Sequence, residues 1–167
     1  MMMGKTCAVT GHRDIPADCV EYVKDRLKAE IEKALTDGYT QFVCGFAEGV
    51  DQYFAEIVAS KCKENTALRL EAAIPYRKRY FQLIKNEKSA ALLAACTDIC
   101  IVSEDYAPNV FMKRNRYMVE NADRVIAVYD GREKGGTVST IRMVHMKRKE
   151  LREIPLKLYI TRADLTR

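Results

Sequence analysis

Long apolar runs are missing from this sequence: none approaches the roughly 20 residues needed to cross a bilayer. Residues 1–5 are too short and too polar to act as a secretory signal. The C-x3-C pair of Cys96 and Cys100 has no second pair and no nearby histidine, which argues against a zinc site. We therefore expect a cytoplasmic protein with reduced thiols and no membrane segment.

Two familiar nucleotide-binding motifs are also absent. The sequence contains no G-x-x-x-x-G-K-[ST] and no G-x-G-x-x-G after its first apolar run. These absences disfavour a P-loop nucleoside triphosphatase and a standard dinucleotide dehydrogenase. The net charge of +5, from 28 basic and 23 acidic residues, suits a phosphate-bearing ligand but is far below that of a histone-like tail.

What the sequence does contain is a regular alternation of short apolar runs and longer helical patterns, which is typical of βαβ units. We predict strands at residues 6–10, 41–44, 68–74, 98–102 and 124–129, with a further edge strand at 156–160. Helices are predicted at residues 17–36, 49–62, 78–95, 111–121 and 138–151. The expected fold is α/β: a Rossmann-like, doubly wound, mainly parallel sheet of five to six strands, with helices on both faces. With 48% hydrophobic residues, residues 1–167 are expected to form a single domain.

Three glycine-containing turns, at residues 10–13, 45–51 and 131–137, each follow a predicted strand and open a predicted helix. Glycine lets the backbone approach a ligand closely, and a helix start points unpaired N–H groups and a positive dipole end at it. Such turns meet at one edge of a parallel sheet. The pattern predicts a nucleotide-phosphate cradle made of Thr10, Gly11, His12, Arg13, Gly45, Ala47, Gly49, Asn115, Gly135, Gly136 and Thr137.

Each turn also has a simpler interpretation. Thr10 or His12 can cap an ordinary strand-to-helix turn, with Arg13 solvated. Asp51 can stabilise the dipole of its own helix. Alternatively, Glu48 or Asp51 accepts hydrogen bonds from a ribose hydroxyl, as carboxylates do in nucleotide sites. The residues alone leave these alternatives open.

Taken together, three segments resemble the SLOG superfamily, which includes the Smf/DprA proteins, the LOG phosphoribohydrolases and the YpsA-like proteins. They are Thr-Gly-His-Arg, Gly-Phe-Ala-Glu-Gly-Val-Asp and Arg-Asn-Arg-Tyr-Met followed by Ala-Asp. The resemblance covers roughly residues 6–150 and is nearest to the YpsA-like branch. It implies a Rossmann-like fold that binds a nucleotide or nucleotide-derived ligand, frequently as a homodimer.

The LOG branch cleaves the N-glycosidic bond of nucleoside 5′-monophosphates, and its motifs are only partly matched. Arg114 falls on the arginine of the M-x-x-R-K motif, but Phe111 replaces the Met and Asn115 the Lys. Residues 135–137 lack the proline of P-G-G-x-G-T-x-E-E, and Ser139 and Thr140 stand in place of its glutamates. The expected catalytic carboxylate is therefore missing.

Three hypotheses follow. The favoured one is a sensor or regulatory domain that binds a small nucleotide, requires no cofactor or metal, and can hold magnesium alongside a phosphate. The second is an N-glycosidic hydrolase with a relocated carboxylate, in which Arg114, Glu48 and Asp51 would be catalytic. The third is single-stranded DNA binding of the Smf/DprA kind, through the basic and aromatic residues 76–81.

Overall fold

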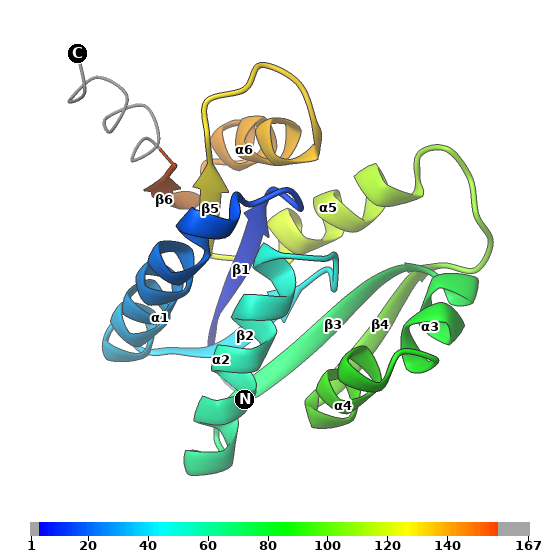
Figure 1. The fold of residues 1–167 in the computed structure, drawn as a ribbon, viewed down its shortest axis with the longest axis horizontal. Coiled ribbons are helices and arrows are strands. Elements are labelled where there is room, and N and C mark those ends of the chain that lie inside the picture. Colours follow the sequence, from blue (N-terminus) through cyan, green and yellow to red (C-terminus); the bar gives the residue numbers. More distant parts are fainter. Residues whose placement is uncertain (1–3, 157–167) are drawn as a thin grey trace.

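The apolar runs become the strands of one sheet in a computed structural model, which describes residues 4–156 (Figure 1). The strands are β1 (Lys5–Gly11), β2 (Tyr39–Cys44), β3 (Arg69–Tyr76), β4 (Asp98–Ser103), β5 (Arg124–Tyr129) and β6 (Glu150–Pro155). The helices are η1 (Ala17–Cys19), α1 (Val20–Thr36), α2 (Val50–Glu64), α3 (Arg77–Ile84), α4 (Glu87–Ala95), α5 (Val110–Asn121) and α6 (Gly136–Met146). All neighbouring strands are parallel, in the order β4-β3-β2-β1-β5-β6.

Helices cover both faces of this sheet. On one face, α1 buries Val23, Leu27 and Ile31 at spacings of four residues, beside buried side chains of α2, α3 and α4. On the other face, Met118 of α5 and Val144 of α6 pack against strand residues that point away from the first core. Each face therefore carries its own apolar layer, and the predicted doubly wound, Rossmann-like fold is confirmed.

The position of the candidate site follows from the strand order. From β1 the chain moves outward through β2, β3 and β4, and α5 then carries it back to β5 on the other side of β1 (Figure 1). The direction of winding reverses between β1 and β5. In open α/β sheets, the connections diverge at this point and leave a crevice at the carboxyl ends of the strands.

Two predicted helices have wrong bounds. The helix predicted at residues 78–95 is two helices, because the Asn86 side chain accepts a hydrogen bond from the Ser89 N–H at 3.0 Å and caps a new helix start. The helix predicted at 138–151 ends at Met146. Arg148 then adopts a left-handed backbone with φ 55°, which turns the chain into β6.

The sixth strand was predicted too late in the sequence. It spans Glu150–Pro155, whereas the predicted range of 156–160 begins where the strand ends and from 157 lies outside the described residues. The strand is polar because its charges are paired: Glu150 with Arg124 of β5 at 2.8 Å, and Arg152 with Glu30 of α1 at 3.0 Å. An edge strand with such partners has no continuous apolar run to mark it.

Candidate functional site

A cavity of about 430 Å³ lies at the carboxyl ends of β1 and β5, where the winding reverses. It brings together most of the predicted site: Thr10, Gly11, His12, Arg13, Ala47, Asp51, Arg114, Asn115, Gly135, Gly136 and Thr137. Gly45, Glu48 and Gly49 do not line it, and Glu48 is exposed to solvent. The remaining lining residues were not among the predicted site residues: Val9, Asp14, Phe111, Met118 and Arg132.

The turn between β2 and α2 is held from inside by Asp51. One oxygen of this buried carboxylate accepts the N–H of Gly45 at 3.2 Å and that of Ala47 at 3.1 Å. Between them Phe46 has a left-handed backbone, φ 54°, with a fully buried ring. A non-glycine residue rarely adopts this conformation, so the Asp51 hydrogen bonds and the buried ring fix a strained turn. Burial raises the pKa of Asp51, although Arg114 and the two N–H groups oppose the rise.

Arg114 reaches this turn from the opposite face of the sheet. Its Nη1 donates to the Gly45 carbonyl at 2.6 Å, and its Nε donates to Asn115 Oδ1 at 2.9 Å. The side chain is 6% exposed, and burial lowers its pKa while Asp51 opposes that change. Arg114 therefore supplies positive charge to the cavity wall while connecting α5 to the end of β2.

The contact between Arg114 and the Gly45 carbonyl requires glycine at position 45. A Cβ added there would lie 2.5 Å from Arg114 Nη1, too close for the two atoms to coexist. We predict that Gly45→Ala displaces the guanidinium and lowers the free energy of unfolding by about 1–3 kcal/mol, as overpacking typically does. Urea denaturation measures the change. Gly136→Ala is the matched control, since its Cβ would meet only Asn115 Nδ2, at 3.9 Å. Equal stability of the two variants would contradict the role of Gly45.

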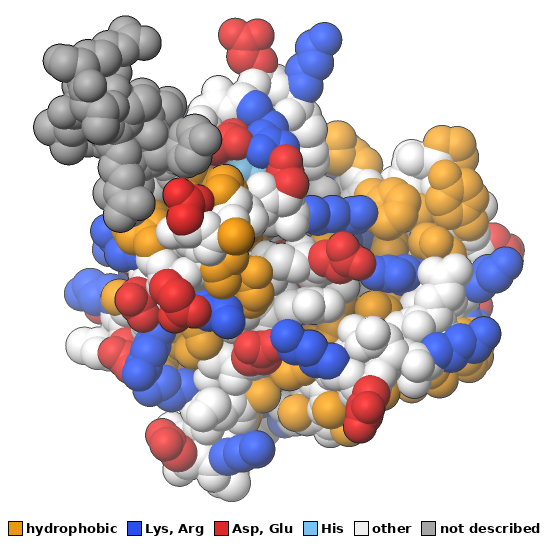
Figure 2. Space-filling view, viewed as in Figure 1, with side chains coloured by type: hydrophobic (Ala, Val, Ile, Leu, Met, Phe, Trp, Pro, Cys, Tyr) orange, Lys and Arg blue, Asp and Glu red, His pale blue; other side chains and the backbone are white. Residues whose placement is uncertain are grey.

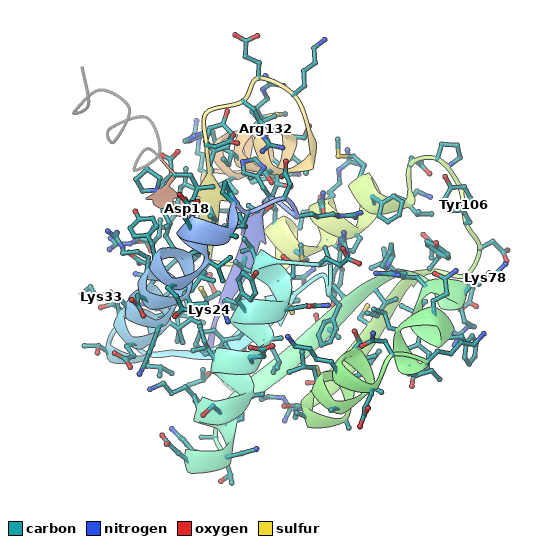
Figure 3. The ribbon with its side chains drawn as sticks, viewed as in Figure 1. Asp18, Lys24, Lys33, Lys78, Tyr106 and Arg132 are labelled. Carbon is teal, nitrogen blue, oxygen red and sulfur yellow. The ribbon has the colours of Figure 1, made fainter. Side chains whose placement is uncertain are left out.

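A polar network closes the cavity between β1 and the connection from β5 to α6. His12 Nε2 accepts the Asp130 N–H at 3.2 Å, and Arg132 pairs with Asp130 at 2.6 Å and with Asp14 at 3.2 Å. Figure 3 labels Arg132 on this connection, above the end of β1. Hydrogen bonds from Arg132 lower the pKa of Asp130 to about 2. The network joins two segments far apart in the sequence and fixes one wall of the site.

The His12 imidazole is held neutral in this network, because burial lowers its pKa more than Asp130 raises it. A histidine with a lowered native pKa binds fewer protons when folded than when unfolded. Its contribution to stability is therefore complete above the unfolded pKa of about 6.5 and is lost as the pH falls below it. Asp130, with its pKa of about 2, titrates in a lower window.

We predict that unfolding free energy falls between pH 7.5 and 5.5, by at most about 1.4 kcal/mol per pH unit for this one group. In His12→Gln, the amide oxygen can still accept the Asp130 N–H but does not titrate, so this component should disappear. Chemical denaturation across the pH range measures both proteins. Parallel pH profiles would show that His12 is not the source of the loss.

The two helix starts at the site differ in what occupies them. At α2 the Asp51 carboxylate sits in the first turn and is already bound by the preceding loop. At α6 the N-cap is Gly135, with φ 125°; within the described chain no side chain caps this helix and its first turn has no acidic residue. Among these two, α6 is therefore the helix start available to an external anion.

Residues 76–81, predicted as a DNA-binding cluster, lie beside the site and not in it. Arg77 pairs with Glu104 at 2.7 Å on the surface, which neutralises it locally. Tyr76 packs edge-on against Tyr106, with ring centroids 5.4 Å apart, and Phe81 is 49% exposed. The cluster is therefore partly structural.

Neither a bilayer-spanning helix nor a group of three or more metal-ligating His, Cys, Asp or Glu side chains occurs within residues 4–156. The six cysteines are all free thiols. Burial raises the pKa of Cys7 and of Cys96 to about 12, which keeps both protonated at neutral pH.

Two solved structures share this fold. DNA processing protein A from Helicobacter pylori, which binds single-stranded DNA, aligns with a TM-score of 0.66 at 23% identity, over 92% of this chain and 66% of its own. TM1055 aligns with a TM-score of 0.54 at 18% identity, over 88% and 72%. This chain thus spans about two thirds of the Helicobacter protein, and at these identities the likeness establishes the fold alone.

Sequence comparison identifies the family. UPF0398 protein lwe1908 of Listeria welshimeri is 25% identical over 142 residues, which cover 78% of each chain. The SPbeta prophage-derived protein YoqJ of Bacillus subtilis is 27% identical over 128 residues, or 68% of this chain and 75% of its own. The model of the YspA SLOG family matches residues 7–165. The chain belongs to the YspA SLOG family.

Proposed function

We propose that this protein binds a small nucleotide or nucleotide-derived ligand in the cavity between β1, β5 and α5, as a sensor or regulatory domain. The observation that carries the proposal is the uncapped start of α6, which forms part of a 430 Å³ cavity together with Arg13 and Arg114. That volume lies in the range of small-molecule sites, about 300–1,000 Å³. Homodimerisation and a cytoplasmic location remain predictions.

The phosphate belongs at residues 135–137. Gly135 and Gly136 leave the first N–H groups of α6 open to the cavity, because their missing side chains remove the nearest obstruction. Arg13 also lines the cavity and is exposed, and within the described residues its guanidinium has no hydrogen-bond partner. A phosphate there would meet both a helix dipole and an uncommitted guanidinium, and a magnesium ion could accompany it.

The base belongs on the α5 side of the cavity. Phe111, Arg114, Asn115 and Met118 are spaced i, i+3, i+4 and i+7, so they form one face of that helix. The two ends of this face are apolar and its centre is polar. Such a wall offers a ring surface for a base and hydrogen bonds for the ribose-phosphate part.

We predict that nucleotides raise the melting temperature of this protein and that Gly136→Val abolishes the effect. A ligand at a hundred times its dissociation constant should stabilise the native state by about 2.7 kcal/mol. The valine would protrude from the open first turn of α6, where the phosphate is placed. Thermal shift against mono-, di- and triphosphates, NAD, ADP-ribose and cyclic nucleotides measures this.

Ser139→Val is the matched control. It adds the same side chain to the same helix at a position that does not line the cavity. Equal nucleotide responses in Gly136→Val and Ser139→Val would contradict a phosphate at α6. No response in the native protein would contradict the proposed function itself.

The hydrolase is the second candidate, favoured by one observation: Asp51 is a buried carboxylate in the cavity wall. Glu48 is exposed and does not line the cavity, which leaves it badly placed for this role. If hydrolysis occurs, release of ribose 5-phosphate and free base from a nucleoside monophosphate should fall at least a hundredfold in Asp51→Asn and stay unchanged in Glu48→Gln. Chromatography of the free base measures it. Absence of release from the native protein would exclude hydrolysis of the nucleotide tested.

Single-stranded DNA binding has weaker support. The Helicobacter protein of similar fold binds such DNA, but at 23% identity the similarity supports a shared fold and not a shared binding surface. In this chain Arg77 of the predicted cluster is already paired with Glu104. The small-ligand cavity therefore remains the better supported site.

A further inference from the structure

Three aromatic rings continue outward from the α5 end of the cavity. Phe111 lines the cavity itself. Tyr76, at the end of β3, packs edge-on against it with ring centroids 6.2 Å apart, and Tyr106 packs edge-on against Tyr76 at 5.4 Å. Tyr106 is 62% exposed, in the connection from β4 to α5. We name Phe111, Tyr76 and Tyr106 the aromatic track.

The track begins close to the proposed phosphate site. Gly136 lies next to Asn115, since a Cβ on that glycine would be 3.9 Å from Asn115 Nδ2. Phe111 is four residues from Asn115 along α5, or about 6 Å along the helix axis. A mononucleotide with its phosphate at α6 can therefore place its base on Phe111, but Tyr76 lies one ring farther out and Tyr106 two rings.

The surface around the aromatic track is rich in hydrophobic side chains, which are better covered by a ligand than exposed to water. Figure 2 shows hydrophobic side chains gathered at the right of the view, over the connection from β4 to α5, where Figure 3 labels Tyr106. Arg79 lies near enough to Arg114 of the cavity wall to contribute to its lowered pKa, after burial itself and Arg13. Arg77, which follows Tyr76 in the sequence, pairs with Glu104 at 2.7 Å. Rings beside positive charge are the surface on which nucleobases stack while their phosphates are neutralised.

We propose that the aromatic track is a second base-binding subsite and that the ligand is a 5′-phosphorylated dinucleotide, with two nucleotides joined 3′ to 5′. The first phosphate lies at residues 135–137, the first base lies against Phe111, and the second base stacks on Tyr106. This inference rests on the proposed nucleotide site. The inference narrows the class of ligand from any nucleotide to one with two bases, because a mononucleotide would leave Tyr106 without a contact.

The test compares AMP with the 5′-phosphorylated dinucleotide pApA by isothermal titration calorimetry, on the native protein and on Tyr106→Ala. Because stacking a base on an aromatic ring strengthens binding at least about fivefold, pApA should bind the native protein at least that much more tightly than AMP. Tyr106→Ala should remove the advantage and leave AMP binding unchanged. Met146→Ala, which truncates a side chain 79% exposed at the end of α6, is the control and should change neither affinity.

Each other outcome has a definite meaning. If both ligands bind with equal affinity, or if Tyr106→Ala leaves the difference intact, the second subsite is overturned while the nucleotide site stands. If neither ligand nor any nucleotide binds, the proposed function fails and this inference fails with it. If a tetradeoxyadenylate binds more tightly than pApA and loses that affinity in Tyr106→Ala, the track serves a nucleic-acid strand and the dinucleotide assignment is overturned. Exposure of Tyr106 makes misfolding of its variant improbable, and its melting temperature checks this.

Discussion

Two buried charges of opposite sign, Asp51 and Arg114, hold the carboxyl edge of the sheet in place. They come from opposite faces, one from the start of α2 and the other from α5, and both bind the turn at Gly45. The carboxylate accepts its N–H and the guanidinium donates to its carbonyl. Burying either charge without such partners would be costly, so the turn, α2 and α5 depend on one another. The wall of the cavity is built on this arrangement.

Because of this arrangement, the glycine turns differ in whether their N–H groups are already hydrogen-bonded within the protein. In the turn after β2, two N–H groups are bound by Asp51, and Gly45 provides room for Arg114, so this turn has a structural role. Within residues 4–156, the turn before α6 has no side-chain cap, so its N–H groups are open to the phosphate proposed above. Two turns that look alike in sequence thus have different roles, which depend on where the nearest carboxylate lies.

The elements that carry a local sequence pattern were predicted correctly. The strand and the site residue that depend on partners distant in the sequence were missed. Five strands and the convergence of the turns followed from apolar runs and glycine positions. The strand β6 was misplaced because its charges are satisfied by Arg124 and Glu30, which lie far from it in sequence. Arg132 was missed for the same reason: its pairing with Asp14 joins residues 118 positions apart. Such contacts leave no periodic signal, and only the fold brings them together.

The charges at the site favour holding a ligand over cleaving its glycosidic bond. Cleavage needs a carboxylate free to stabilise an oxocarbenium-like state. The two that line the cavity are engaged, Asp51 with backbone N–H groups and Asp14 with Arg132. Where the LOG motif has glutamates, Thr140 instead donates to the Gly136 carbonyl at 2.8 Å within its own helix. Of the arginines that line the cavity, Arg114 and Arg132 are engaged, but Arg13 is exposed. A site with satisfied anions and an available cation suits phosphate binding better than N-glycosidic hydrolysis.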